Sequence, residues 1–440
     1  MRPATKQSRV TRAVRAEATR AKRLAGAVHE FAEPAFKEVK SSRALADYLE
    51  GHGFDVAFPF RKIPTAFRAV WGRGKPVVGM LGEYDALPNC GEAEGTWGHG
   101  CGHDLLGVGA ATVAIIAKAV MEAAGLRGTL VYYGCPAEET LAGKAYMARD
   151  GAFRDLDACL AWHPGGTTGA NNVGGSALDS LVYEFFGRTA HGASAHLGRS
   201  ALDAVMLFDV AANYLREHIP ETMRIHMVVR DGGDAPNVVP AYAKVWYYLR
   251  GTDREQVDEV RKRLDACAQG AATASGTTMK VTRLTAVYSR LPNDVLAETV
   301  RKNLVLFGAP RATAGDRTRV KGLGLKATFA TGIAEGFGTQ GRGSSDEDTV
   351  SWLVPLGRFT VACIAKGTPG HNRLATSQGT WPFALRGMLQ AAKVFAGCAL
   401  DLVGDAALLR GVRAEFRKRT RDFTFDPLIP RRQPVPIDPP

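Results

Sequence analysis

The sequence has few of the features that mark secreted or membrane proteins. Its 440 residues include only 7 cysteines, an odd number without a pairing pattern, which argues against a disulfide scaffold and favours a reducing compartment. No uninterrupted apolar run reaches the roughly 18 residues that a bilayer-spanning helix needs. No apolar segment follows the basic residues near the start, so we expect no secretory signal. Together these absences predict a cytoplasmic protein without a membrane segment.

What the chain does have is ordinary globular composition with an excess of positive charge. Apolar residues make up 45% and charged residues 23%, and a chain of this length favours two domains. The net charge of +12 could attract nucleic acid or anionic substrates. Because much of the excess lies in residues 1–23 and 410–432, we predict a mainly solvated basic surface and no nucleic-acid partner.

The most informative stretch is Gly98–Leu106, which reads Gly-His-Gly-Cys-Gly-His-Asp-Leu-Leu. Three potential metal ligands, His99, Cys101 and His103, alternate with glycines, which let the backbone adopt positive φ and approach closely. Side chains two residues apart share a face of extended backbone, and a thiolate with an imidazole suits a transition metal. The spacing predicts a metal site at the entrance of a buried helix over 105–123. A glycine-rich turn with incidental histidines is the alternative.

Further ligand types follow three predicted strands, over 76–81, 128–134 and 156–162. The first strand leads into an acidic loop that ends at Pro88, the second into Glu138 and Glu139, and the third into His163. In open α/β sheets, ligands bind at this edge. Adjacent carboxylates need a nearby cation, so a metal held by one of the pair would leave the other as a proton shuttle. Two solvated glutamates are the alternative for the pair alone.

The pattern changes at about residue 178. Strands and helices are expected in the order strand 178–187, helix 200–218, strands 222–230 and 238–250, helix 253–272 and strand 278–288. This β-α-β-β-α-β order is typical of a ferredoxin-like α+β domain. Because the helix–strand pattern resumes afterwards, we predict an inserted domain over 178–291 between two parts of one α/β domain, 1–177 and 292–440, the second with a Pro-rich C-terminal tail.

Several motifs extend along the chain in a fixed order. They are Gly82–Pro88, Gly98–Asp104, Gly134–Glu139, Trp162–Pro164, Gly198–Ala204, Asn237–Pro240, Val350–Trp352, Gly367–His371 and Pro427–Pro430. On these motifs the chain resembles the M20 family of metallopeptidases and amidohydrolases. It most resembles the branch that contains one of the subunits of aminobenzoyl-glutamate hydrolase and the amino-acid amidohydrolases. The resemblance implies an α/β catalytic domain with a mixed sheet flanked by helices, interrupted by a dimerisation domain.

The resemblance also implies a site with two divalent transition-metal ions per subunit. Zinc or manganese is expected, with cobalt or nickel as alternatives. Glu138 is the implied general base, and Asp85 is implied to orient a ligand. The implied metal ligands, of which the first is placed to bridge the ions, are Cys101, His103, Glu139, His163 and His371.

Residues of the inserted domain are implied to complete the site. In the family, a histidine at the position of His191 reaches into the partner subunit's site and stabilises the oxyanion. A cap on the adjacent loop is an alternative role for His191, and His196 is an alternative residue. Asn237 and Arg250 are candidates to bind a substrate carboxylate. The expected assembly is a homodimer or a higher homo-oligomer.

Some segments depart from the branch and leave the substrate open. They are Arg68, Asn89–Glu92 and Gly343–Glu347. We expect a metal-dependent hydrolase that cleaves the amide C–N bond of an N-acyl, aromatic amino acid, a small anionic substrate similar to aminobenzoyl-glutamate. The first alternative is hydrolytic deamination of an activated amino-aromatic acid, which releases ammonia instead of an amino acid. The second is an inactive binding or partner subunit.

Overall fold

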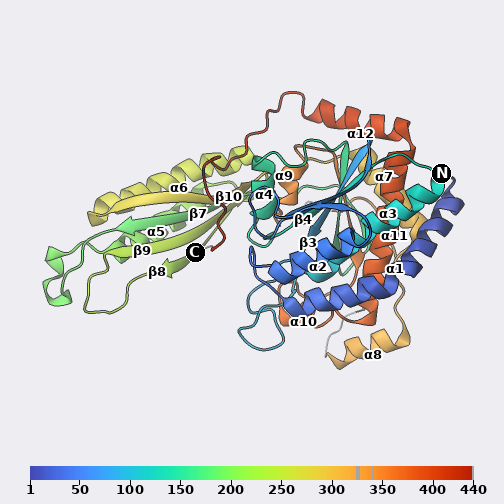
Figure 1. Ribbon diagram of the computed structural model, residues 1–440. Coiled ribbons are helices and arrows are strands. Elements are labelled where there is room, and N and C mark those ends of the chain that lie inside the picture. The colour runs from blue at the N-terminus through green and yellow to red at the C-terminus, as the bar shows by residue number, and fades with distance from the viewer. Residues whose placement is uncertain (324–327, 339–340, 342, 439–440) are drawn as a thin grey trace. The chain divides into compact units, whose positions relative to one another are not determined.

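The computed structural model describes residues 1–323, 328–338, 341 and 343–438. The chain forms two compact units. Unit 1 contains Met1–Val173, Leu291–Gln340 and Val350–Asp426, and unit 2 contains Gly174–Arg290, Gly341–Thr349 and Pro427–Pro440. Figure 1 traces both along the chain.

Unit 1 is built on a seven-stranded sheet in the order β1-β2-β4-β3-β5-β11-β6. Its strands are β1 (Asp55–Ala57), β2 (Phe67–Arg73), β3 (Val77–Glu83), β4 (Gly128–Cys135), β5 (Ala158–Gly165), β6 (Gly169–Asn171) and β11 (Leu356–Ala362). The centre is parallel, since β3 pairs with β4 and β5, and β5 pairs with β11. The outer pairs β1–β2, β2–β4 and β11–β6 are antiparallel. The sheet is therefore mixed, as predicted.

Helices of unit 1 pack around this sheet (Figure 1). They are α1 (Pro3–Phe31), α2 (Val39–Glu50), α3 (His103–Ala124), α4 (Gly143–Arg149), α7 (Asp294–Phe307), α8 (Ala314–Gly322), α10 (Arg373–Thr376), α11 (Pro382–Gly404) and α12 (Ala406–Arg419), while the short α9 (Glu347–Val350) spans the division between the units. Helix α3 lies very close to the sheet, because a Cβ at Gly109 would be 2.6 Å from Cζ2 of Trp162. This close approach fixes the start of α3 beside the ends of the central strands.

Two helices, α3 and α11, are long and apolar enough to cross a membrane by length and composition alone. The prediction of no membrane segment considered only uninterrupted apolar runs. Charged residues such as Lys118 interrupt these runs in the sequence. Within the qualifying windows, 89% of α3 and 72% of α11 is buried inside the protein. Their apolar surface is thus used in the core, where it packs against the sheet and against the other helix.

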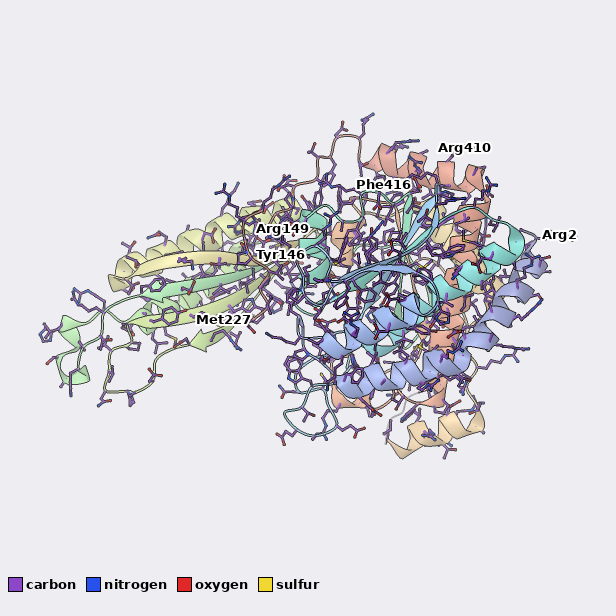
Figure 2. All side chains as sticks on the ribbon, viewed as in Figure 1. Arg2, Tyr146, Arg149, Met227, Arg410 and Phe416 are labelled. Atoms are coloured by element: carbon purple, nitrogen blue, oxygen red, sulfur yellow. The ribbon has the colours of Figure 1, made fainter. Side chains whose placement is uncertain are left out.

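The predicted basic surface agrees with the exposure of most basic residues near both ends of unit 1. Figure 2 shows Arg2 and Arg410 projecting from this unit. Lys6 is different, because it is buried and its Nζ lies 2.6 Å from Oδ2 of Asp401 and 2.9 Å from Oδ1 of Asn303. This contact fastens the start of α1 to α11 and α7.

Unit 2 has the predicted ferredoxin-like fold. Its elements are β7 (Ala177–Phe186), the short 3-10 helices η1 (Gly192–Leu197) and η2 (Arg216–His218), α5 (Ala201–Leu215), β8 (Arg224–Asp231), β9 (Tyr242–Gly251), α6 (Arg254–Ser275) and β10 (Thr278–Val287). The antiparallel sheet has the order β10-β7-β9-β8. Alternate residues of β9, such as Val245 and Tyr247, pack under α5 and α6. The residues between them lie on the helix-free face.

The units differ from the predicted domains by a few residues at the boundaries, 174–177 and Leu291, and in two longer segments. Both Gly341–Thr349 and the tail from Pro427 group with unit 2, although the sequence placed them in the second catalytic part. The tail groups with unit 2 because it contacts β10. The side-chain amide of Gln433 donates to the carbonyl of Arg283 at 2.7 Å, and Arg283 donates to the carbonyl of Leu428 at 2.8 Å.

Candidate metal centre

The candidate centre lies where the carboxyl ends of three parallel strands meet the start of α3. Strands β4, β3 and β5 are neighbours in the sheet, so the loops that follow them emerge at the same edge. Glu83 ends β3, Glu138 and Glu139 follow β4, and His163 lies near the end of β5. His103 begins α3. Distant parts of the sequence therefore supply one cluster.

The structure brings all five predicted metal ligands together, with Glu138 beside them. Three groups of side chains place their ligand atoms within 4.8 Å of one another. The groups are Cys101 with His103 and His163, Cys101 with Glu139 and His371, and His103 with Glu83 and Glu138. Cys101 belongs to the first two groups, which is the arrangement expected of a ligand shared by two ions.

Hydrogen bonds orient the buried His103 and the half-buried His163. Nδ1 of His103 lies 2.8 Å from Oδ1 of Asp85, and Nδ1 of His163 lies 2.6 Å from the carbonyl oxygen of Pro164. Because a carbonyl only accepts, the neutral His163 carries its proton on Nδ1. Its Nε2 is then free to act as a ligand and lies 3.4 Å from Sγ of Cys101. Such partners are what fixes the orientation of metal-bound imidazoles.

The loop of His371 packs against the glycine-rich loop. The backbone N–H of His371 donates to the carbonyl of Gly100 at 3.1 Å. His371 has a φ of 55°, which is uncommon for a residue with a side chain. Its Nε2 lies 3.8 Å from Oε2 of Glu139. The side chain is more exposed than the other ligands, so this end of the cluster opens to solvent.

The polar atoms of the cluster fit a bound transition metal. Nε2 of His103 and Oε1 of Glu139 are buried and have no hydrogen-bond partner among the described residues. Buried polar atoms normally have a partner. Thiolate, imidazole and carboxylate groups together suit ions such as zinc or manganese rather than calcium. A metal would therefore satisfy atoms that the protein leaves without a partner.

The electrostatics of the cluster also call for a cation. Burial, and then the charges of Glu83 and Glu139, raises the pKa of Glu138 well above its usual range. Burial raises the pKa of the Cys101 thiol to about 12. By contrast, burial and the positive charge of Arg358 lower the pKa of His163 to about 4, so this imidazole is neutral at pH 7, as a metal ligand must be.

A buried ion pair adjoins the cluster, and the sequence did not predict it. Nζ of Lys144 lies 2.8 Å from Oε1 of Glu83, and both side chains are buried. The second oxygen of Glu83 lies 3.3 Å from Nε2 of His103. Burial raises the pKa of Glu83, but Lys144 and the nearby histidines outweigh it and lower the value to about 2. The sequence signal is weak, because Lys144 is one of two basic residues in the short helix α4, the other being Arg149.

Glu38 is a second residue that the sequence did not indicate. Its side chain is buried and accepts hydrogen bonds from the backbone N–H groups of Ala137 and Phe36, at 2.8 and 2.9 Å, and from the hydroxyl of Thr65 at 2.8 Å. Ala137 has a φ of 56° and directly precedes Glu138. Glu38 thus fastens the turn that presents the paired glutamates.

His99, which the spacing alone left open as a ligand, belongs to none of the three groups. Its Nε2 lies 3.0 Å from the carbonyl oxygen of Val28. Asp104 also contacts the N-terminal helix, with Oδ2 2.7 Å from Nδ1 of His29. The loop therefore turns His99 and Asp104 toward α1, and Cys101 and His103 toward the cluster.

The candidate residues of the inserted domain all lie in unit 2. Nδ1 of His191 accepts a hydrogen bond from the backbone N–H of Ala193 at 3.0 Å, the loop contact considered as its alternative role. A neutral imidazole that accepts at Nδ1 carries its proton on Nε2, so that nitrogen can donate. The N–H of Gly192 donates to the carbonyl of Asn237 at 2.7 Å, which places His191 and Asn237 in adjacent segments. His196 is exposed in η1, and Arg250 lies on β9.

The departures from the family pattern have local roles. Arg68 pairs with Asp155, with Nη2 2.7 Å from Oδ2. Within Asn89–Glu92, Cys90 is buried against the glycine-rich loop, because its Sγ lies 3.0 Å from where a Cβ on Gly100 would be. Glu347 pairs with the buried Arg290 inside unit 2.

Comparisons with known proteins show what the chain is similar to. A family model described as a peptidase dimerisation domain matches residues 176–274. The chain is 36% identical to one of the subunits of p-aminobenzoyl-glutamate hydrolase of Escherichia coli K12, with 95% of this chain and 96% of that protein covered. It is 28% identical to the Xaa-Arg dipeptidase of Mus musculus, over 91% and 89% of the two chains. Its fold matches a Bacillus subtilis structure described as a dinuclear metal binding peptidase from the M20 family, with a TM-score of 0.58, 19% identity, and 89% and 99% coverage.

The buried pair of Lys144 and Glu83 generates a stability prediction. Lys144→Met should lower the free energy of unfolding by about 3–5 kcal/mol, because it leaves a buried carboxylate without its cation. The double variant Glu83→Gln/Lys144→Met should lose less, because both charges are removed. Urea unfolding measures both values. Lys75→Met is the matched control, since Lys75 is 66% exposed in its pair with Asp157 and its loss should cost at most about 1 kcal/mol. A double variant less stable than Lys144→Met would contradict this role of the pair.

Proposed function

The chain belongs to the M20 family of metallopeptidases and amidohydrolases, and on that premise we propose that it is a metal-dependent amidohydrolase of N-acyl amino acids. The observation that carries the proposal is the sharing of Cys101 between two ligand groups, with Glu138 next to His103 of the first group. A peptidase-type hydrolase needs a polarised carbonyl and an activated water in one place. The cluster offers residues for each requirement.

The candidate ligand residues would divide between two ions. Cys101, His103 and His163 would hold one, and Cys101, Glu139 and His371 would hold the other. Two bound divalent ions, zinc or manganese in preference to cobalt or nickel, would polarise the scissile carbonyl and lower the pKa of a bound water. The positive charge of the site would also offset the repulsion among the carboxylates.

Glu138 is the residue that moves the proton. Its Oε2 lies 3.8 Å from Nε2 of His103, so it is next to the ligands without belonging to either of the proposed metal-holding groups. It accepts the proton of the water as the water oxygen attacks the amide carbon. It then returns this proton to the nitrogen as the C–N bond breaks. The products are a carboxylic acid and an amino acid.

The substrate we propose is an N-acyl amino acid with an aromatic acyl group. The relative with 36% identity is named for p-aminobenzoyl-glutamate, and this name supports an anionic, aromatic acyl amino acid. Analysis of products from the purified chain tests this directly. Release of an amino acid supports amide cleavage, release of ammonia supports the alternative deamination, and activity only with a second, different chain supports a partner role.

The paired glutamates should have separable functions. Glu138→Gln should bind metal as the wild type does but lose roughly 10²–10⁴-fold in kcat, the usual contribution of general acid–base catalysis. Glu139→Gln should instead lose metal, because an amide is a poorer ligand than a carboxylate. Metal content by mass spectrometry and steady-state kinetics on the same preparations separate the two effects. Equal loss of metal in both variants would contradict the assignment.

We also propose that unit 2 forms a homodimer through β8. The two edge strands differ, because the tail contacts β10, with Gln433 donating to the carbonyl of Arg283 and the Arg283 side chain donating to the carbonyl of Leu428, whereas β8 is the other edge of the sheet. Val228 and Val229 on β8 are 45% and 40% exposed. The neighbouring α5 also exposes apolar side chains, namely Met206, Leu207, Val210 and Tyr214. Pairing this edge across a two-fold axis would cover both features.

In that dimer, we propose that His191 donates from Nε2 to the oxyanion formed in the partner subunit's site. Mixing two inactive variants, His191→Ala and Glu138→Gln, with subunit exchange tests this. Each variant alone should lose about 10²–10³-fold or more. Each heterodimer would contain one site with both defects and one with neither, so activity should recover towards half.

The matched control mixes wild type with the double variant His191→Ala/Glu138→Gln. If His191 acts in the partner's site, every site of this heterodimer carries one defect, and wild-type activity should fall below simple dilution. If His191 acts in its own protomer, the first mixture stays inactive and the second follows dilution, which would overturn the proposal.

A further inference from the structure

One short segment of the chain, residues 28–38, contacts three loops that present residues of the candidate centre. It begins in the last turn of α1 and ends at the residue before α2 (Figure 1). The three loops are the glycine-rich loop before α3, the acidic loop after β3 and the turn of the paired glutamates after β4. The segment, the loops and all the candidate ligands belong to unit 1. The contacts are therefore internal to the unit that holds the centre.

The start of the segment holds the glycine-rich loop at both of its ends. Nε2 of His99 lies 3.0 Å from the carbonyl oxygen of Val28, and Oδ2 of Asp104 lies 2.7 Å from Nδ1 of His29. Because an ionised carboxylate only accepts, His29 donates from Nδ1. His99 and Asp104 flank residues 101–103, which include two candidate ligands. Fixing both flanks limits the positions that these ligands can take.

The pair of His29 and Asp104 is closely packed. Asp104 is buried. A Cβ added at Gly379 would be 2.9 Å from Oδ2 of Asp104 and 3.1 Å from Nδ1 of His29. A charge-assisted hydrogen bond in such a buried place is stronger than one exposed to water. It can therefore hold the first turn of α3 against the end of α1.

The middle of the segment holds the acidic loop. The backbone N–H of Ala86 donates to the carbonyl of Glu33 at 2.8 Å, and Pro34 forms an isolated parallel bridge with Ala86. Ala86 directly follows Asp85, which contacts two of the candidate ligands. The side chain of Glu33 also accepts the backbone N–H groups of residues 40–41 at 2.9 Å. The backbone that carries Asp85 is thus tied to the start of α2 through this segment.

The end of the segment holds the turn of the paired glutamates. Oε1 of Glu38 accepts the backbone N–H groups of both Phe36 and Ala137, and Oε2 accepts the hydroxyl of Thr65. One carboxylate oxygen therefore joins the segment to the turn. Because Glu138 is the next residue after Ala137, this oxygen sets the position of Glu138 relative to the segment.

We infer that residues 28–38 set the spacing of the three loops before ions bind, with His29 and Glu38 as the positioning residues. The inference rests on the proposed metal centre and adds the residues that prearrange it. The loops follow different elements, so their spacing depends on contacts between distant parts of the chain. A site that is already arranged loses less conformational entropy when it binds its ligand. His29 and Glu38 belong to none of the three ligand groups and act through the loops that they hold.

Metal affinity, measured by competition with a chelator, tests the role of His29 without relying on catalysis. His29→Ala should raise the Kd of both ions about 10–100-fold, the usual effect of losing an outer partner of a metal site, because the loop carries the shared Cys101. His29→Asn should stay close to the wild type, since its amide nitrogen can donate from nearly the position of Nδ1. Rescue by this variant distinguishes positioning from a general loss of packing.

Variants of Glu38 should affect the other end of the centre. Glu38→Leu should weaken only the ion held by Glu139, and should also lower kcat, because the same turn carries Glu138. Glu38→Gln should resemble the wild type, since its amide oxygen can still accept both backbone N–H groups. If Glu38→Leu does not fold, His29→Ala and His29→Asn still test the inference.

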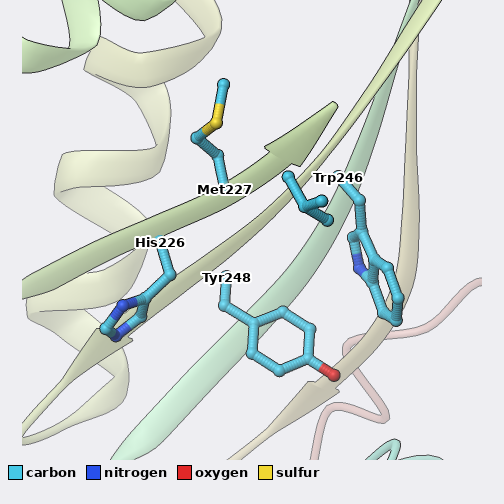
Figure 3. A pocket seen from close by; sticks show the side chains of 5 residues that line it. His226, Met227, Trp246 and Tyr248 are labelled. Carbon is cyan, nitrogen blue, oxygen red and sulfur yellow. The ribbon is translucent and has the colours of Figure 1, made fainter. Parts of the chain in front are cut away.

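Two control variants should lower stability but leave the metal Kd unchanged. Glu17→Ala removes a buried side chain of α1 that accepts the hydroxyl of Tyr48 on α2 at 3.0 Å. Trp246→Ala removes a ring that lines a hollow of about 260 Å³ on β8 and β9 of unit 2 (Figure 3) and donates to Ser180 at 2.8 Å. Tyr48 and Ser180 both lie outside the three loops. Urea unfolding of every variant measures the loss of stability for comparison.

The outcomes separate this inference from the proposed function. If the wild type binds two ions but hydrolyses no N-acyl amino acid, and His29→Ala weakens metal binding, the inference stands and the proposed function is wrong. If the wild type binds metal and hydrolyses these compounds, and both His29→Ala and Glu38→Leu keep the wild-type Kd, the inference is overturned and the proposed function stands. An equal loss of metal affinity in either control variant would also overturn the inference.

Discussion

The candidate centre depends on two contacts made by the carboxylate of Asp85. One oxygen lies 2.8 Å from Nδ1 of His103, and the other accepts the backbone N–H of Glu139 at 2.9 Å. A single side chain thereby sets the orientation of a ligand on α3 and the position of a ligand after β4. It also fixes which nitrogen of His103 faces the cluster. The close packing of α3 on the sheet brings these partners within reach, so the fold and the site are joined at this residue.

Around Asp85, the protein gives several buried carboxyl groups partners of their own. Glu38 is bonded to backbone N–H groups and a hydroxyl, and Glu83 is paired with Lys144 at 2.8 Å. Glu138 and Glu139 instead face His103 and His371, at the longer distances of 3.8–3.9 Å. Since buried carboxylates are costly without compensation, this difference points to the paired glutamates and their histidines as the place where bound cations complete the structure.

The sequence predicted the fold well because its signals are local. The β-α-β-β-α-β order identified unit 2, and the family resemblance carried by motifs at strand ends implied the ligands that come together. What it missed depends on contacts between distant residues. Lys144 meets Glu83 from 61 positions away, and the tail reaches β10 across about 150 positions. The direction of His99 depends on how one loop turns between α1 and the cluster. None of these contacts leaves a periodic signal in the chain.

The central claim is that Cys101 is shared by two metal ions, and metal stoichiometry tests it most directly. Wild-type protein, Cys101→Ala and Cys398→Ala would be loaded with zinc or manganese, desalted and analysed by mass spectrometry for ions per chain. Cys398 is buried in α11 and belongs to none of the ligand groups. The account predicts two ions per chain in the wild type and in Cys398→Ala. It predicts that Cys101→Ala retains neither ion tightly. Two tightly bound ions in folded Cys101→Ala would contradict it.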